Sequence, residues 1–189
     1  DKSDNKTITL NRYLGLRRNE LTRLHGNDLQ QDRLGNWYVY VDKGKGGKAQ
    51  RQYVLPQDVE KVRAFFDGSS NLLFRKADMD SKYNYHAQRH ELAKKAYAYY
   101  AERIAADPNY AKELYRNVAE SWHHLNKRDR AALEPRSYFE TKYKLRGKNR
   151  ALAQKTGKPI EYDRLALRAV SVLHLSHWRD NITIDYLLS

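Results

Sequence analysis

Apolar residues recur at three- to four-residue intervals over most of this sequence, a spacing typical of amphipathic helices. One short stretch, residues 36–42, alternates instead, with Trp37, Val39 and Val41 on one face, and predicts a half-buried strand. Residues 51–55 predict the returning strand of a β-hairpin. The helical spacing covers residues 7–24 (interrupted near Gly15), 56–66, 84–106, 108–122, 163–175 and 181–188. We therefore predict a mainly α fold with a small antiparallel β-sheet, in the α+β class.

Composition narrows the class of protein. With 189 residues, 40% of them hydrophobic, the chain can bury one substantial core, and we predict a single domain over 1–189. Its 36 lysines and arginines outnumber its 23 acidic residues, so the net charge is +13. A polyanion, nucleic acid ahead of a membrane surface, is the expected partner class, although a basic soluble protein without such a partner has the same charge.

Two further absences limit the chemistry and the location. The sequence has no cysteine, which excludes disulfides, thiolate metal sites and cysteine nucleophiles. It begins with polar residues and contains no run of ~18 apolar residues, so we predict neither a signal peptide nor a membrane span. A cytoplasmic location is the expectation that follows.

Several of the predicted elements carry polar residues that could take part in binding or catalysis. Arg17 and Glu20 lie one turn apart on a helix face, although surface ion pairs at this spacing are common. The turn 43–48 carries three lysines and three glycines, and glycine lets a backbone approach a partner closely. Lys45 at this tip could lie beside a phosphate; the alternative is a solvated basic turn.

His86, Arg89 and His90 share one side of the predicted helix 84–106. A His-x-x-x-His pair on a helix can bind zinc. The adjacent glutamate of the zinc proteases is lacking, however, and Arg89 would repel a cation. We predict no metal site here.

The C-terminal stretch contains a histidine and a tyrosine of special interest, His177 and Tyr186. A tyrosine hydroxyl, with a reference pKa near ~10, attacks poorly unless a cationic pocket holds an anionic electrophile in line with it. Arginine suits phosphate oxygens, and lysine and histidine can move protons. With Arg17, Lys45, His86 and Arg89, these residue types are the parts of a metal-free phosphoryl transfer through a covalent intermediate. Taken alone, Tyr186 is better explained as one of 15 tyrosines, packing an amphipathic C-terminal helix.

Four short boxes in chain order carry a family resemblance. They are Gly15–Leu21 (GLRRNEL), Gly44–Lys48 (GKGGK), His86–His90 (HAQRH) and Leu175–His177 (LSH), the last followed by Tyr186. Together they resemble the T-G-x-R-x-x-E-L, G-K-G-x-K, H-x-L-R-H and L-G-H…Y boxes of the catalytic domain of the tyrosine recombinase (phage integrase) family. Leu14, Gln88 and Ser176 stand where the family usually has Thr, Leu and Gly.

The resemblance implies DNA cleavage and rejoining. Tyr186 would attack a scissile phosphate, giving a 3′-phosphotyrosyl link and a free 5′-hydroxyl. Arg17 and Arg89 would neutralise the pentacoordinate transition state. The bond energy is kept in the phosphotyrosine, so no ATP, metal or other cofactor is expected.

The remaining roles implied by the resemblance are supporting ones. Lys45 would be the general acid for the leaving 5′-oxygen, His86 would assist as an acid or base, and His177 would hydrogen-bond the phosphate. Glu20 would orient neighbouring groups. In the hairpin, the expected DNA-binding residues are Lys43, Lys48 and Arg51.

The expected partner is double-stranded DNA, bound by a homo-tetramer on paired sites, with a monomer in the absence of DNA and a bacterial or phage context. We also expect that the family's N-terminal core-binding domain is absent from this chain. The resemblance covers about 8–104 and 163–189, which leaves a predicted insertion at about 105–162. Within it, residues 138–154 predict helix in part, broken at Gly147, and 155–159 predict a loop.

Two alternative functions stay open at the level of sequence. A type IB topoisomerase uses a similar set of arginine, lysine, histidine and tyrosine residues, although the LSH and HAQRH boxes are more similar to those of integrases. A catalytically inactive relative would bind DNA without cutting it. Trapping a covalent DNA adduct separates the inactive relative from both enzymes.

Overall fold

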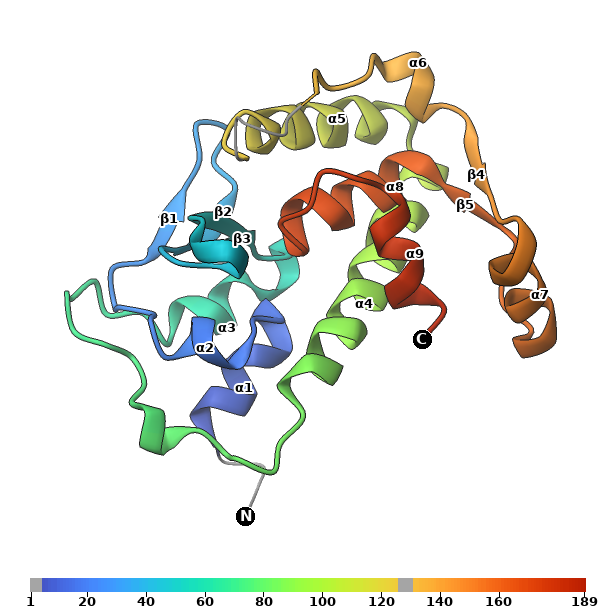
Figure 1. Cartoon of the computed structure of the whole chain (residues 1–189). Coiled ribbons are helices and arrows are strands. Elements are labelled where there is room, and N and C mark those ends of the chain that lie inside the picture. The colour runs from blue at the N-terminus through green and yellow to red at the C-terminus, as the bar shows by residue number, and fades with distance from the viewer. Residues whose placement is uncertain (1–4, 126–130) are drawn as a thin grey trace. The chain divides into compact units, whose positions relative to one another are not determined.

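The structure, a computed structural model, describes residues 5–125 and 131–189, apart from the side chain of Lys45. The chain forms two compact units, one ending at Leu92 and the other beginning at Ala93 (Figure 1). The predicted single domain with an insertion at 105–162 stays a prediction, because the compactness of parts does not decide whether they act as one domain. No helix in the described ranges is both long and apolar enough to cross a membrane.

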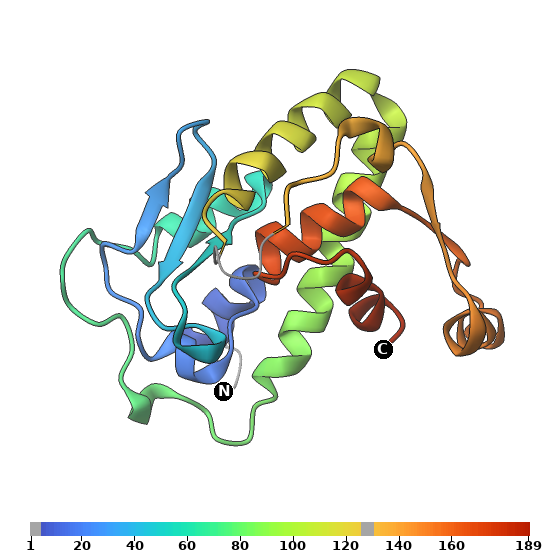
Figure 2. The same ribbon diagram turned by 45° about the horizontal axis from the view of Figure 1, so that its top comes forward.

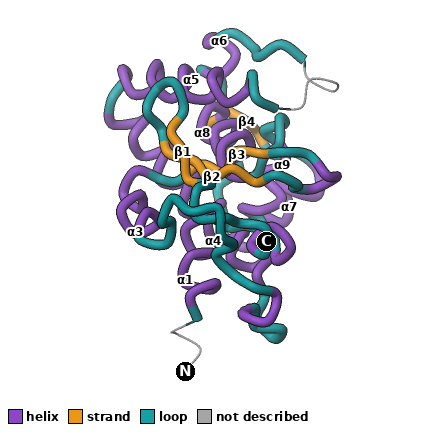
Figure 3. Tube along the Cα trace, turned by 90° about the vertical axis from the view of Figure 1, so that its left-hand side faces the viewer, coloured by secondary structure: helices purple, strands orange, loops and turns teal. Residues whose placement is uncertain are grey.

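The first unit combines short helices with a three-stranded sheet. Its elements are α1 (Lys6–Leu14), α2 (Arg18–Leu21), β1 (Leu29–Gln31), β2 (Trp37–Val41), η2 (Lys45–Gly47), β3 (Gln50–Tyr53), η3 (Pro56–Asp58), α3 (Val59–Arg63), η4 (Lys76–Asp78) and the start of α4 (Tyr85–Ala106). The strands are antiparallel in the order β1-β2-β3, with Val39 opposite Leu29 and Gln52, and they lie side by side in Figure 3.

One hydrophobic cluster holds this unit together. Leu10 and Leu14 of α1 and Leu21 of α2 are fully buried in it, beside Val39 and Val41 of the sheet. The period-two pattern of β2 places these valines inward, as the sequence predicted. The sheet and the two N-terminal helices therefore share one core.

The second unit is built from helices and a two-stranded antiparallel ribbon. Its elements are the rest of α4, α5 (Pro108–Trp122), α6 (Arg136–Phe139), β4 (Lys142–Lys144), α7 (Gly147–Thr156), β5 (Glu161–Asp163), α8 (Arg164–Ala169), the π-helical turn η6 (Val170–His174) and α9 (Asn181–Leu187). The buried side chains Leu114, Val118 and Trp122 lie on α5, which packs against α8 and η6. The ribbon β4–β5 carries α7 at its far end (Figure 2).

The predicted fold class is confirmed at the level of α+β: the chain is 53% helical with a small antiparallel sheet. The hairpin β2–β3 and the stripe on α5 are also confirmed. Strand β1 was missed because its residues are half-buried or exposed and show no alternation.

The prediction for residues 138–154 was partly wrong. Lys142–Lys144 forms strand β4, and Gly147 begins helix α7 instead of breaking one. Its φ of +54° turns the chain from strand into helix, a conformation that glycine reaches without a Cβ penalty. Lys155 and Thr156, predicted to lie in a loop, belong to the last turn of α7, which Gly157 ends.

Candidate active site

Arg17 and Glu20 form a bonded pair at the start of α2. The Arg17 backbone N–H donates to Glu20 Oε2 at 2.8 Å, and Arg17 Nη1 donates to Glu20 Oε1 at 3.0 Å. The Glu20 side chain is only 3% exposed, whereas that of Arg17 is 33% exposed. A buried carboxylate thus fixes the position of an arginine that still reaches solvent, which is the arrangement expected of an orienting residue.

Arg89 is brought to the same region by the turn between α1 and α2. Gly15 ends α1 with φ +59°, and its carbonyl accepts a hydrogen bond from Arg89 Nη1 at 3.0 Å. A Cβ on Gly15 would lie 2.8 Å from Leu92 Cδ2 and 3.4 Å from Arg89 Cα. Only glycine permits this approach. The hydrogen bond therefore joins the buried guanidinium of Arg89 to Gly15, two residues before Arg17.

A buried asparagine, which the sequence analysis missed, holds this turn in shape. Asn11 Oδ1 accepts from the Leu16 backbone N–H at 2.7 Å, and Asn11 Nδ2 donates to the Leu16 carbonyl at 3.0 Å. An asparagine among the apolar positions of α1 is the signal that could have revealed it, because buried polar groups need hydrogen-bond partners.

The basic residues at and near the hairpin tip differ in their exposure and contacts. Lys43 and Lys48 are exposed, and the Lys43 carbonyl accepts from Arg23 Nη1 at 2.6 Å. Arg51 lies over the Tyr38 ring at 4.4 Å and donates to the Tyr53 hydroxyl at 3.3 Å, so it supports the sheet. The backbone of Lys45 starts the 3-10 turn η2, and its side chain lies outside the described part.

His86 pairs with His90 on the first turns of α4. Their Nε2 atoms are 3.1 Å apart, and the rings meet edge to face. One nitrogen must donate and the other accept, so at least one of the two imidazoles is neutral in this contact. Within the described ranges, no group of three or more His, Cys, Asp or Glu side chains is arranged to hold a metal ion.

His177 follows a strained residue in the second unit. Ser176 has φ +52° and is the one residue other than glycine in the described ranges with positive φ. The His177 backbone N–H donates to the Ser171 carbonyl at 2.8 Å, and its Nδ1 accepts from the Arg179 N–H at 3.2 Å. The family box resembled by Leu175–His177 has glycine at this middle position, where positive φ carries little cost.

Tyr186 is half-buried on α9, a helix tied to α8 and η6. Thr183 Oγ1 donates to the Leu167 carbonyl at 2.9 Å, and Ser171 Oγ donates to the Arg179 carbonyl at 2.6 Å. These bonds fix the loop that carries His177 and the helix that carries Tyr186 to the same buried elements.

In the first unit the structure pairs Arg17 with Glu20 and bonds Arg89 to the carbonyl of Gly15, two residues before Arg17, with His86 one turn before Arg89 on α4. The second unit places His177 and Tyr186 on adjoining segments. The convergence of all six predicted catalytic residues on one phosphate stays a prediction.

Comparison with known proteins adds no further support. No protein-family model matches the chain, and no curated protein or solved structure is significantly similar to it.

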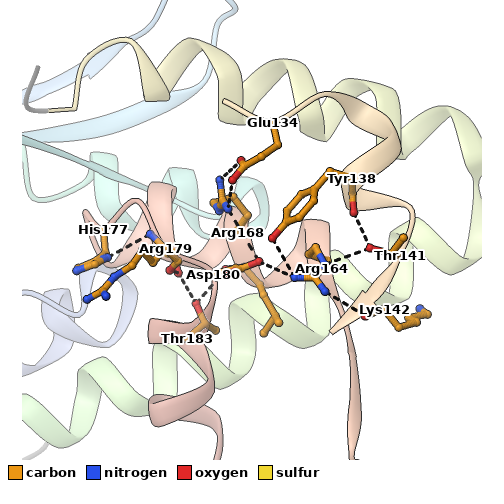
Figure 4. Close-up of polar contacts among 12 residues, drawn as sticks. Glu134, Tyr138, Thr141, Lys142, Arg164, Arg168, His177, Arg179, Asp180 and Thr183 are labelled. Carbon is orange, nitrogen blue, oxygen red and sulfur yellow. Dashed lines mark hydrogen bonds and ion pairs between the residues drawn. The ribbon is translucent and has the colours of Figure 1, made fainter. Parts of the chain in front are cut away.

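A network of charged residues around α8 was not foreseen from the sequence (Figure 4). Arg168, 3% exposed, donates to both carboxylate oxygens of Glu134 at 2.7 and 3.2 Å. Asp180 lies 3.4 Å from Arg164 Nη1 and 3.9 Å from Arg168 Nη2. Burial raises the pKa of Glu134, but the hydrogen bond and charge of Arg168 outweigh it, and the pKa is lowered overall.

This network holds the segment before α9 in place. Asp180 precedes α9 directly, so its contacts with Arg164 and Arg168 secure the loop from His177 to Arg179 against α8. Two arginines four residues apart in an otherwise apolar helix are the signal that could have predicted it, because buried arginines require acidic partners.

Proposed function

We propose that this chain is a site-specific DNA recombinase that cleaves and rejoins strands through Tyr186. The observation that carries the proposal is the Gly15 turn, which joins Arg89 to the segment that begins with Arg17. Two arginines far apart in sequence thereby belong to backbone segments that contact each other. A phosphate bound there would accept hydrogen bonds from the planar guanidinium groups, which is the role that the resemblance implies for Arg17 and Arg89.

The reaction is a transesterification at phosphorus. Tyr186 Oη attacks, the P–O5′ bond breaks, and a 3′-phosphotyrosyl bond replaces it. Lys45 donates the proton that the leaving 5′-oxygen acquires, and His86 acts as the base that accepts the phenolic proton lost by Tyr186. Arg17 and Arg89 stabilise the charge on the non-bridging oxygens, with His177 as a further donor. Attack by a 5′-hydroxyl on the phosphotyrosine reverses the steps and completes strand exchange.

Ser176 supports the placement of His177 in this scheme. A left-handed conformation at a serine is uncommon and costs about 1–3 kcal/mol. It occurs at the position where the resembled box has glycine, so the backbone there keeps the turn that presents the following histidine.

Covalent trapping tests the proposal. Duplexes from a panel of sequences, each carrying a 5′-bridging phosphorothiolate, release a thiolate that religates poorly, so an adduct accumulates. We expect a protein–DNA adduct with the wild-type chain and none with Tyr186→Phe. Tyr99→Phe, which alters another half-buried tyrosine, is the matched control and should form the adduct. An adduct with Tyr186→Phe removes this residue from its role.

The same substrates test Lys45. A 5′-thiolate leaves without protonation, so Lys45→Ala should cleave the phosphorothiolate at nearly the wild-type rate. With the ordinary 5′-oxygen it should be slower by about 10²–10⁴. Lys48→Ala, in the same turn, should slow both substrates by the same factor, because Lys48 is expected to bind DNA and not to donate the proton. Equal slowing of Lys45→Ala on both substrates would assign this lysine to binding.

A further inference from the structure

The segment from β4 to β5 carries an unusual concentration of positive charge. Residues 142–163 contain seven lysines and arginines and two acidic residues, a net charge of +5, and no acidic residue lies between 141 and 160. Lys142 and Lys144 pair with Asp163 and Glu161 across the ribbon at 3.6 and 3.7 Å. The ribbon itself is thus largely neutralised, and the uncompensated charge lies on α7 and the residue before it.

The cations of α7 have no partner of opposite charge in the described structure. The residues concerned are all exposed: Arg146, Lys148, Arg150 and Lys155. Arg146 and Arg150 are four residues apart, a spacing at which like charges destabilise a helix. Ala153 is the helix's single buried residue, so hydrophobic burial offsets this repulsion only weakly.

An open groove of about 410 Å³ adjoins these cations. It is lined by the residues Lys142, Tyr143, Lys144, Leu145, Arg146, Asn149 and Arg164. Of the four cationic side chains around this groove, Lys142, Lys144 and Arg164 are paired with carboxylates, whereas Arg146 has no acidic partner in the described ranges. Arg146 and the Asn149 amide therefore match the anionic oxygens of a phosphodiester backbone.

The segment is also joined to the helix that carries Tyr186. Leu145, Ala153 and Tyr162 belong to one buried cluster with Ile184 and Leu187 of α9. Lys158 Nζ donates to the Leu187 carbonyl at 3.1 Å. A backbone held on α7 would therefore be held at a fixed position relative to α9.

We propose that β4, α7 and β5 form an auxiliary DNA-binding module that grips duplex phosphates beside α9. The binding of a polyanion follows from the charges and the groove, whereas its identity as duplex DNA rests on the proposed function. The module lies in the segment that the family resemblance does not cover, so it gives that segment a role.

Salt-dependent binding tests the module. In the non-cleaving Tyr186→Phe background, Lys148→Gln/Arg150→Gln is compared with Lys112→Gln/Arg116→Gln, which removes the same two charge types from exposed positions of α5. Each phosphate contact contributes about 0.9 to the slope of log K against log salt. Loss of two contacts should lower the slope by about 1.8, which makes the rise in Kd from 50 to 200 mM salt about twelvefold smaller. The α5 variant should keep the parent slope.

Site-directed crosslinking gives a readout that does not depend on affinity. Because the chain has no cysteine, Asn149→Cys can carry a single photoreactive maleimide and should crosslink to a 30-base-pair duplex, whereas Lys112→Cys should not. An unchanged slope in the α7 variant, an equal loss in the α5 variant, or equal crosslinking from both cysteines overturns the module. Adduct formation is scored separately: adducts without an α7 effect disprove the module alone, and an α7 effect without adducts disproves the chemistry alone.

Discussion

Gly15 and Ser176 both adopt left-handed backbone conformations beside residues of the candidate site. At Gly15 the conformation is free of strain, and the missing side chain allows α4 to approach. At Ser176 the same conformation is strained, and the hydroxyl is buried without a hydrogen-bond partner among the described residues. These two positions therefore predict opposite responses to a change of side chain.

Replacing Gly15 with alanine should destabilise the fold by about 2–5 kcal/mol, since it adds a φ penalty of about 1–2 kcal/mol and overpacking against Leu92 of about 1–3 kcal/mol. Gly157→Ala is the matched control: its φ is +68°, yet no atom lies within 4 Å of the added Cβ. It should lose only about 1–2 kcal/mol. Urea denaturation measures both; equal losses would show that the contact with α4 is unimportant.

Ser176→Gly should be more stable than Ser176→Ala by about 1 kcal/mol, because only glycine relieves the left-handed strain. In an ordinary helical position the order is the reverse. Both substitutions remove the buried hydroxyl, so the comparison isolates the backbone. A more stable alanine variant would contradict the strain. Thermal unfolding of the two variants provides the measurement.

At the scale of elements, the loop and helix that carry His177 and Tyr186 depend on a network centred on α8. Arg168 lies between Glu134 and Asp180, and its guanidinium also lies over the rings of Trp122 and Phe139 at 5.3 and 5.1 Å. The buried arginine cannot lose its charge, so removal of Glu134 leaves that charge incompletely compensated.

The network predicts that the free energy of unfolding falls in acid. The pKa of Glu134 is lowered in the folded state, so the unfolded chain takes up the proton more readily and acid favours unfolding. Glu134→Gln should cost about 1–2 kcal/mol near pH 7, a value reduced because the carboxylate is 37% exposed. The difference in unfolding free energy between wild type and Glu134→Gln should be fully present above pH 4.5, the ordinary pKa of a glutamate, and should shrink as the pH falls below it. Melting curves from pH 7 to pH 3 test this; a gap that widened in acid would contradict the sign.

The elements also show what sequence reasoning can reach. β2 and β3 were predicted because alternating valines on β2 face a core, and α5 because its apolar residues recur at helical spacing. β4 and β5 are three residues each, and each has a single tyrosine between two charged residues, which is too short to show an alternating pattern. Short strands of this kind are stabilised by the neighbouring strand and not by their own pattern.

At the scale of the whole molecule, the dominant property is its charge of +13. If the partner is duplex DNA bound through about 6–10 phosphates, the Kd of Tyr186→Phe should rise by about 10³–10⁵ between 50 and 200 mM salt. Fluorescence anisotropy with a 30-base-pair duplex measures this. A change of less than tenfold would show that the net charge does not act through phosphate contacts.

The sequence by itself determined the α+β class, the hairpin, the helical stripes and the residue types available for phosphoryl transfer. These follow from local periodicity and composition, which need no knowledge of distant contacts. Only the tertiary structure decided that Arg89 bonds to the Gly15 turn, that Asn11 shapes this turn, and that Glu134 and Asp180 flank Arg168. Such pairings join residues far apart in the chain, and packing alone selects which of many possible partners meet.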